Sequence, residues 1–286
     1  MQVKVEKQPK STLKLEITIP VTRVKETYGE VLNEVAKNTT IQGFRKGQAP
    51  INLVKEKTQT SELYGEVVNK LLETYYPQAL KENKISPVSN PKVEIKEFDL
   101  EKDFEFVATI ALKPEVKIKP EYKSELKKTW VKIQKDHTGH DHEVQLSAGD
   151  VIKTLIENSE LEVADLLIEE EVNRMFSRLI QQTQAVGISM EDFLKSQNKT
   201  AEDLRKDYQK TSEESIKAEF ILSQLTDEEK IEVTEKEIDA MVAAVGDKDA
   251  AEKMNSPMQR WYIKSVLAKN KLVEKLIEEV TKEVKK

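Results

Sequence analysis

The chain has 286 residues, of which 34% are charged and 6% aromatic, and it carries a formal net charge of −6 and no cysteine. The length allows two domains with separate cores, and the many charges and few aromatic residues favour an extended, largely helical body. The lack of cysteine excludes disulfides and thiolate metal sites. Because no signal-peptide or membrane-spanning run is recognisable, we expect a soluble cytoplasmic protein without a membrane partner.

Charge is unevenly distributed along the sequence. Residues 1–118 carry 19 Lys and Arg against 17 Asp and Glu, a net charge of +2, whereas residues 119–286 carry 27 against 35, a net charge of −8. The front part is therefore better suited to approach RNA. So small a surplus predicts a local contact and no general nucleic-acid binding, to DNA included.

The first 118 residues show the pattern of an α+β domain. A helix is expected over residues 21–35, where apolar residues recur every three or four positions, and another from about Thr60, until Pro77 bends or ends it. Three stretches alternate apolar and polar residues and predict strands of a small antiparallel sheet: residues 13–19, 93–95 and 104–112. We expect the helices to cover one face of this sheet.

Between these two helices lies the segment Gly43-Phe44-Arg45-Lys46-Gly47-Gln48-Ala49-Pro50, whose proline is expected to open a further short helical segment. Glycine tolerates backbone angles that other residues resist, and proline suits the first turn of a helix, so the segment predicts an exposed loop between helices. Its tip would offer one aromatic ring and two cations, which suits a partner with an apolar cleft and phosphates, such as the ribosome. The alternative is an ordinary helix connection with Phe44 buried in its own core.

Residues 119–149 are interpreted as a linker, because they are rich in Lys and Glu and end in a segment of turn composition. The only three histidines of the protein, His137, His140 and His142, lie in this linker beside Asp136 and Asp141. Such spacing could ligate Zn²⁺ or Ni²⁺. We favour a solvated linker without a metal, since a flexible chain would have to lose its freedom to close around the ion.

From residue 150 to the end, the sequence predicts an all-α domain of long helices that form arms. Ser189, Thr200 and Thr234 each precede an acidic residue by three positions, the spacing of a helix-start cap, and Ser256-Pro257 predicts another start. A weak internal repeat with an offset of about 70 residues relates 161–172 to 231–242. It suggests two similar arms beside a concave surface.

The loop at residues 43–50 resembles the ribosome-docking signature of the trigger factor family of bacterial chaperones, and the flanking elements and residues 151–280 resemble that family by pattern. The resemblance implies an ATP-independent chaperone that docks near the nascent-chain exit, on a large-subunit protein and rRNA, and shields unfolded polypeptide in a helical cradle. It implies docking through Gly43, Phe44, Arg45, Lys46, Gly47 and Pro50. A homodimer off the ribosome is left open.

The same resemblance implies client contacts in the C-terminal domain. Most apolar residues there must form the core, since large exposed apolar patches invite aggregation. The candidates for client contact lie near capped turns and loops, and methionine adapts well to varied partners. These candidates are Met190, Phe193, Met254, Met258 and Trp261.

No catalytic constellation and no cofactor site is recognisable in the sequence. Members of the family usually carry a prolyl isomerase domain on the order of 100 residues, too large for the segment available here, so we expect no isomerase activity. Two alternatives stay open. One is a chaperone that works off the ribosome, and the other is a residual prolyl isomerase with a degenerate site, which a proline-limited refolding assay would detect.

Overall fold

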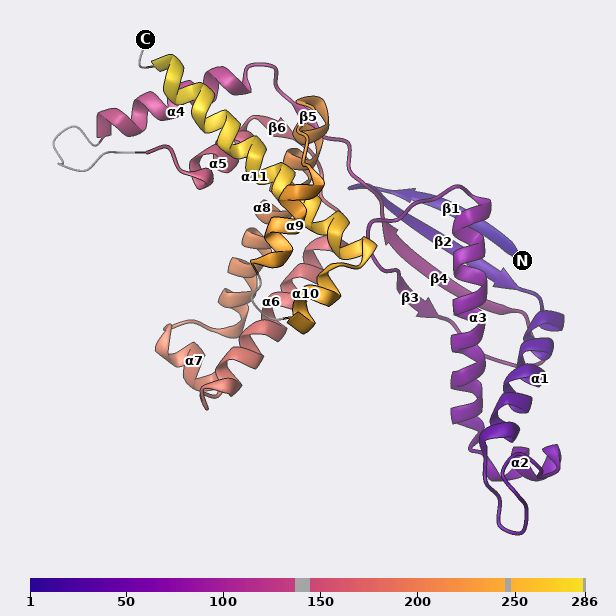
Figure 1. Ribbon diagram of the computed structural model, residues 1–286. Helices are drawn as coiled ribbons and strands as arrows, with labels where there is room; N and C mark the ends of the chain where they lie inside the picture. The colour runs from indigo at the N-terminus through magenta and orange to yellow at the C-terminus, as the bar shows by residue number, and fades with distance from the viewer. Residues whose placement is uncertain (137–144, 245–247, 285–286) are drawn as a thin grey trace. The chain divides into compact units, whose positions relative to one another are not determined.

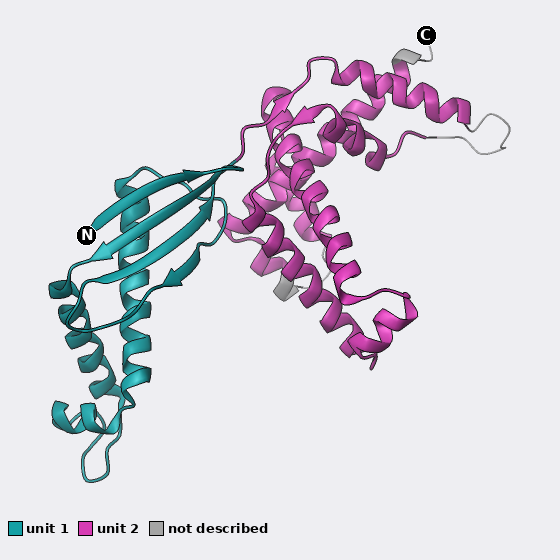
Figure 2. Ribbon diagram, turned by 180° about the vertical axis from the view of Figure 1, so that it is seen from behind, with its two compact units in different colours: residues 1–113 teal, residues 114–286 magenta. Residues whose placement is uncertain are grey.

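The computed structural model describes residues 1–136, 145–244 and 248–284. The chain divides into two compact units, unit 1 (Met1–Lys113) and unit 2 (Pro114–Lys286), which are coloured separately in Figure 2. The three histidines of the metal hypothesis lie outside the described residues. No helix among the described residues is both long enough and apolar enough to cross a membrane.

Unit 1 is an α+β structure with a four-stranded antiparallel sheet in the order β1-β2-β4-β3 (Figure 1). Its elements are β1 (Gln2–Gln8), β2 (Thr12–Ile19), α1 (Val21–Asn38), α2 (Ile51–Lys57), α3 (Thr60–Glu82), β3 (Lys92–Ile95) and β4 (Phe104–Ala111). In the central pair, Leu15 lies opposite Ala108 and Ile17 opposite Phe106. These side chains are buried on the face that the helices cover, as the alternating pattern predicted.

Helix α3 continues through Pro77 to Glu82, so of the two expectations, that this proline bends or ends the helix, the second is corrected. Proline removes one helical hydrogen bond and crowds the preceding turn, at a cost of about 3 kcal/mol. Leu71 and Ala79 are fully buried on either side of it. The burial of such side chains, worth roughly 1.5–3 kcal/mol for a leucine, outweighs that cost along the helix.

Unit 2 is almost entirely helical. Its elements are β5 (Lys117–Ile118), α4 (Tyr122–Asp136), α5 (Ala148–Glu157), β6 (Ser159–Glu160), α6 (Asp165–Ala185), α7 (Met190–Ser196), α8 (Ala201–Glu228), α9 (Glu235–Ala243), α10 (Lys248–Met254) and α11 (Pro257–Val284). Its main core is built by α4, α5, α8 and α11, and a smaller core gathers around Ile238 and Ile263. The two strands β5 and β6 pair antiparallel with each other.

Most of the expected linker is part of this domain. Residues 122–136 form helix α4, whose Tyr122, Leu126 and Trp130 are buried in the main core of unit 2. Their spacing of four residues places them on one helix face. The linker interpretation is therefore corrected for α4, because one apolar stripe is enough to anchor a helix that is otherwise highly charged.

The predicted helix starts in unit 2 agree with the structure. The hydroxyl of Ser189 accepts the backbone N–H of Asp192 at 3.1 Å, and Thr200 does the same with Asp203, also at 3.1 Å. Thr234 and Glu237 form a capping box at the start of α9. Helices α6 and α9 begin 70 residues apart, at Asp165 and Glu235, as the repeat suggested. Two buried valines, Val163 and Val233, occupy the same place before these two helices.

Candidate docking loop and client surface

Two glycines determine the backbone conformation of the loop between α1 and α2. Gly43 and Gly47 have φ angles of +90° and +79°, in the left-handed region that residues with side chains disfavour. A Cβ atom on Gly47 would lie 2.9 Å from the carbonyl oxygen of Lys37, so no side chain fits there without a shift. Three backbone hydrogen bonds close the loop, donated by Phe44 to Ile41 (3.0 Å), by Gly47 to Thr39 (3.4 Å) and by Gln48 to Arg45 (2.9 Å).

The ends of the loop are anchored on unit 1. Ile41 and Ala49 pack against its core, and Pro50 occupies the cap position before α2. Val54 of α2 is fully buried. The loop lies at the end of the α1–α3 helical layer that points away from the sheet (Figure 1). The tip of the loop is thus held by flanking residues that pack on the core of unit 1.

The tip residues themselves face solvent. The side chain of Phe44 is 40% exposed, and those of Arg45 and Lys46 are exposed as well. Neither cation forms an ion pair with any residue that the structure describes. The Phe44 ring is therefore not sealed in the core of its own domain, which was the alternative to docking.

Several neighbours of the loop were not identified from the sequence. Ile51, at the start of α2, is 39% exposed, as much as Phe44. Lys37, in the last turn of α1, and Lys55 and Lys57, in the last turn of α2, are also exposed. The clue in the sequence is that residues 37–58 hold five cations and a single carboxylate, Glu56.

In unit 2, the structure separates the five candidate client residues. Met258 and Trp261, in the first turns of α11, are 77% and 70% exposed. Tyr262, which was not predicted, adds a third side chain at 60% exposure. Met254 is partly buried and packs against the smaller core of unit 2. The start of α11 is therefore an apolar surface made by Met258, Trp261 and Tyr262.

Met190 and Phe193 belong to α7, at the far end of α6 and α8 (Figure 1), and both are half-buried. Exposed apolar side chains surround this end of the arm. They are Ile180, Val186 and Ile188, of which Val186 is 68% exposed. This arm tip is a second apolar surface of unit 2.

Two hollows border helix α8. One, of about 720 Å³, lies between α5 and α8 and has Ile152, Ile156 and Leu222 among its lining residues. The other, of about 330 Å³, lies between α8 and α11 and includes Leu222, Trp261 and Tyr262. Because Leu222 borders both, the two hollows are neighbours, and the second reaches the apolar surface at the start of α11.

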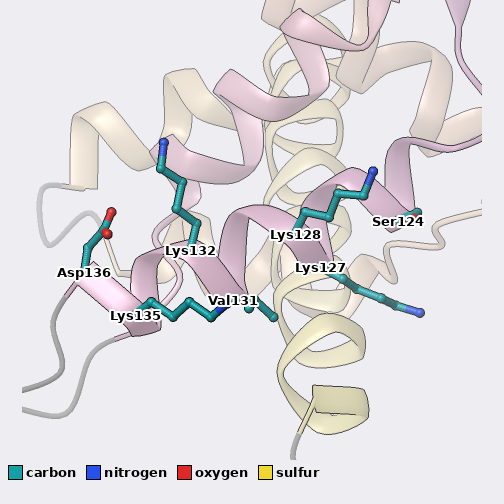
Figure 3. A pocket seen from close by; sticks show the side chains of 7 residues that line it. All are labelled: Ser124, Lys127, Lys128, Val131, Lys132, Lys135 and Asp136. Atoms are coloured by element: carbon teal, nitrogen blue, oxygen red, sulfur yellow. The ribbon is translucent and has the colours of Figure 1, made fainter.

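A third hollow, of about 450 Å³, lies along the outer face of α4 (Figure 3). Its lining is basic, with Lys127, Lys128, Lys132 and Lys135 extending from the helix. Lys128 is paired with Glu125 on the same helix, 2.7 Å away. Ser124 and Asp136 complete the lining, and we assign no chemistry to this hollow.

The strongest electrostatic effects in unit 2 are structural. Glu229, just after α8, accepts hydrogen bonds from Lys275 at 2.5 Å and Lys123 at 2.9 Å, and these lower its pKa from 4.5 to about 2. The same contact raises the pKa of Lys123, and burial raises that of Tyr122 to about 12. The network joins α4, the end of α8 and α11. These pKa shifts keep Glu229 ionised and Lys123 and Tyr122 protonated near neutral pH, so none of the three groups is suited to proton transfer there.

Within the described ranges, the acidic and imidazole side chains form no group of three or more that could hold a metal ion. The acidic run Glu169-Glu170-Glu171 lies on α6, where Glu171 pairs with Arg174 at 2.8 Å. The described surface thus offers a charged loop in unit 1 and apolar surfaces in unit 2.

The fold of the chain has a counterpart among solved structures. It is similar to a solved structure of the trigger factor chaperone described for promiscuous substrate recognition in folding and assembly, with a TM-score of 0.67 and 15% identity over 98% of this chain and 100% of that one. Residues 1–144 match the family described as bacterial trigger factor protein, and residues 121–283 match the C-terminus of the same protein. The chain therefore belongs to the trigger factor family.

Curated relatives support this membership. The trigger factor of Clostridium kluyveri is 36% identical over 137 residues, which are 48% of this chain and 32% of that protein. The trigger factor of Clostridium botulinum strain Hall is 35% identical over 135 residues, which are 47% of this chain and 31% of that protein. The aligned part thus spans about one third of the length of these relatives.

Proposed function

We propose that this protein is an ATP-independent holding chaperone that docks on the ribosome near the nascent-chain exit and shields unfolded polypeptide on the helices of unit 2. The observation that carries the docking part is the exposed Phe44-Arg45-Lys46 tip, held by two glycines at positive φ. The ring can enter an apolar cleft while the guanidinium and ammonium groups pair with phosphate or carboxylate oxygens. Membership of the trigger factor family supports the same function.

The two units divide the work in this proposal. Unit 1 is the ribosome-binding domain and unit 2 the client-binding domain. This replaces the division at residues 118 and 149, because α4 belongs to the core of unit 2. The partners are a large-subunit protein and rRNA on one side and unfolded nascent polypeptide on the other.

Client binding is assigned to the apolar surfaces of unit 2. Met258, Trp261 and Tyr262 offer adaptable and aromatic contacts beside the hollows along α8, and the arm tip offers Val186 and Ile188. Contacts of this kind are individually weak. A client is released once the burial of apolar surface within its own fold becomes more favourable than the contact with the arms.

The proposed chaperone acts by binding alone. The two family matches, at residues 1–144 and 121–283, overlap, so no unmatched stretch between them approaches the size of an isomerase domain, on the order of 100 residues. A proline-limited refolding assay tests this part of the proposal. Acceleration of refolding by the protein would contradict it.

The docking proposal is tested by co-sedimentation of the full chain with purified ribosomes. We expect the variant Phe44→Ala, Arg45→Ala, Lys46→Ala to fold normally and to lose co-sedimentation. A matched control is Val5→Ala, Lys7→Ala, Lys81→Ala, which also removes one part-exposed apolar side chain and two cations of unit 1. Co-sedimentation unaffected by the loop variant would refute docking, and suppression of client aggregation in that case would favour a chaperone that works off the ribosome.

A further inference from the structure

Strand β1 is an edge strand of the sheet in unit 1. In the described part of the chain it pairs with β2 on one side, and no other strand lies on its second side (Figure 1). Backbone N–H and C=O groups that point away from β2 can therefore pair with a further strand. The opposite edge strand, β3, is shorter, with four residues against seven in β1, and it directly follows Pro91. The edge of β1 is thus the better suited of the two to strand pairing.

The helices of unit 1 cover the centre of the sheet more completely than the β1 edge. Leu15 of β2 is fully buried, whereas Val5, directly opposite it on the same face, is 40% exposed. Val3 also lies on this face and is partly buried against the core. A strand added beside β1 would therefore cover two valines, and its own apolar side chains would pack against them.

The other face of β1 carries two charges of opposite sign. Lys4 lies opposite Glu16 of β2, with 3.2 Å between the ammonium and the carboxylate, and Glu6 lies opposite Lys14. Both charged side chains of β1 are exposed. Because opposite charges directly across a strand pair stabilise the pair, an added strand would be favoured with an acidic residue opposite Lys4 and a basic residue opposite Glu6.

We propose that the free edge of β1 binds an extended segment of unfolded polypeptide, which joins the sheet as an additional antiparallel strand. The segment has an apolar residue opposite Val5, an acidic residue opposite Lys4 and a basic residue opposite Glu6. Main-chain hydrogen bonds, which every polypeptide can form, provide the contact, and the side chains add a preference. This inference goes beyond the proposed function, because neither ribosome docking nor the apolar surfaces of unit 2 require it.

A second copy of β1 is the competing occupant of this edge. Antiparallel pairing about Val5 would place Lys4 of each copy opposite Glu6 of the other. The contact would be small, since a seven-residue strand is about 24 Å long and roughly 10 Å wide, and two copies would together bury roughly 500 Å². Stable protein interfaces bury at least about 1,200 Å². An edge of this size is better suited to the transient binding of one extended segment.

The lysines of β1 also have a structural explanation. Charged side chains on an edge strand hinder the pairing of exposed edges and so protect a protein from aggregation. Lys7 agrees with this explanation, because it lies on the helix-covered face, opposite Leu13. Lys4 and Glu6 agree with it less well, since their opposite charges favour a partner strand that has the complementary pair.

The experiment titrates the full chain with the synthetic heptapeptide Thr-Glu-Lys-Val-Glu-Val-Thr at millimolar concentration, and NMR follows the backbone amides of β1. In the antiparallel register the central Val of the peptide faces Val5, the Glu after it faces Lys4 and the Lys before it faces Glu6. We expect the amide resonances of residues 2–8 to shift. The charge-exchanged peptide Thr-Glu-Glu-Val-Lys-Val-Thr should bind roughly four- to thirtyfold more weakly, because two attractive cross-strand pairs become repulsive.

Two protein variants locate the contact. We expect Val5→Lys to weaken binding of the first peptide roughly two- to fivefold, because the apolar cross-strand pair is lost. The matched variant is Val88→Lys, which changes a valine of unit 1 that is 42% exposed and lies outside the strands. It should leave the affinity for the peptide unchanged.

A third arm tests the main-chain hydrogen bonds directly. It uses two forms of the first peptide, each methylated on every second backbone nitrogen, so that each form lacks the N–H groups of one edge. Because only one edge of an added strand donates to β1, one form should lose binding and the other should retain it.

The outcomes separate this inference from the docking proposal. Unshifted β1 amides, equal binding of the two methylated forms, or a Val5→Lys variant that binds like wild type would overturn strand addition and leave docking untouched. Shifts of the β1 amides that grow with protein concentration in the absence of peptide would assign the edge to a second copy and also overturn it. Absence of ribosome binding would refute docking and leave strand addition standing.

Discussion

The two units of this chain leave different groups without partners. In unit 1 five cations around the loop are exposed, and none of them is paired with a described carboxylate: Lys37, Arg45, Lys46, Lys55 and Lys57. In unit 2 the cations of α11 are largely engaged: Arg260 pairs with Glu235 and Asp239, Lys271 with Glu237, and Lys275 with Glu229. Beside these paired cations, α11 exposes three apolar side chains at its start, Met258, Trp261 and Tyr262.

This difference indicates how the partner of each surface can be inferred. Unpaired charges that cluster on a surface are available for binding, and the same holds for apolar side chains outside a core. Unit 1 is suited to a charged partner of fixed structure. Unit 2 is suited to apolar segments of many sequences, since methionine and aromatic side chains adapt to varied surfaces.

The largest expected effect concerns clients. We expect Met258→Ala with Trp261→Ala to weaken the binding of a permanently unfolded client by about 1–2 kcal/mol, roughly five- to thirty-fold in Kd, because exposed Trp side chains often dominate such contacts. Fluorescence anisotropy of a labelled client without ribosomes measures this. The variant Phe44→Ala, which removes the exposed ring of unit 1, should leave client affinity unchanged. If it weakens client binding equally, the division of function between the units is wrong.

The next effect concerns the paired charges of unit 2. The pKa of Glu229 is lowered from 4.5 to about 2 in the folded protein, so its contribution to stability is complete above pH 4.5 and is lost as the pH falls from 4.5 through 2. Both tryptophans, Trp130 and Trp261, lie in unit 2, so tryptophan fluorescence during unfolding reports on this unit.

We expect the midpoint of the unfolding transition, followed by tryptophan fluorescence, to fall more steeply with decreasing pH below pH 4.5 in wild type than in Glu229→Gln. The variant has no carboxyl group to titrate at this site. Glu278→Gln is the control, since Glu278 pairs with Lys282 on an exposed part of α11. A wild-type profile parallel to that of Glu229→Gln would show that the network does not stabilise the unit.

The smallest effect concerns the shape of the loop. Gly47→Ala places a Cβ against the Lys37 carbonyl at a positive φ, and we expect a strain of about 1–1.4 kcal/mol and a roughly five- to tenfold loss of ribosome affinity. Gly43→Ala meets no atom within 4 Å and should lose less. Hydrogen exchange over residues 39–50 would show whether the loop has opened. Equal ribosome affinity of Gly47→Ala and wild type would mean that this loop conformation is not needed for docking.

Much of the fold follows from local patterns in the sequence. The alternation in β2 and β4 and the hydroxyl–acid pairs before α7, α8 and α9 were sufficient, because each signal reflects one physical requirement of a strand face or a helix end. The edge strand β1 could not be identified in this way. Of its residues, Gln2–Gln8, only Val3 packs against the core, where it is partly buried, and the strand is otherwise defined by its backbone pairing with β2.

Helix α4 was missed for a different reason. Its buried Tyr122, Leu126 and Trp130 are surrounded by lysines and preceded by two prolines, so composition outweighed periodicity in the interpretation.

The candidate docking site was predicted only in part. Phe44, Arg45 and Lys46 follow from the loop motif. Lys37 and Ile51 join them only because α1 ends and α2 begins beside the loop, and Lys55 and Lys57 because they end the short helix α2.

The two equivalent valines that precede α6 and α9 bear on which sequence changes this protein can tolerate. Val163 and Val233 are buried two residues before each helix begins, so each helix is anchored where it starts. Val186 and Ile188, at the other end of the first arm, have no comparable role in the core. If the arm tip binds clients as proposed, we expect substitutions there to alter which polypeptides it prefers while the stability of the domain stays the same.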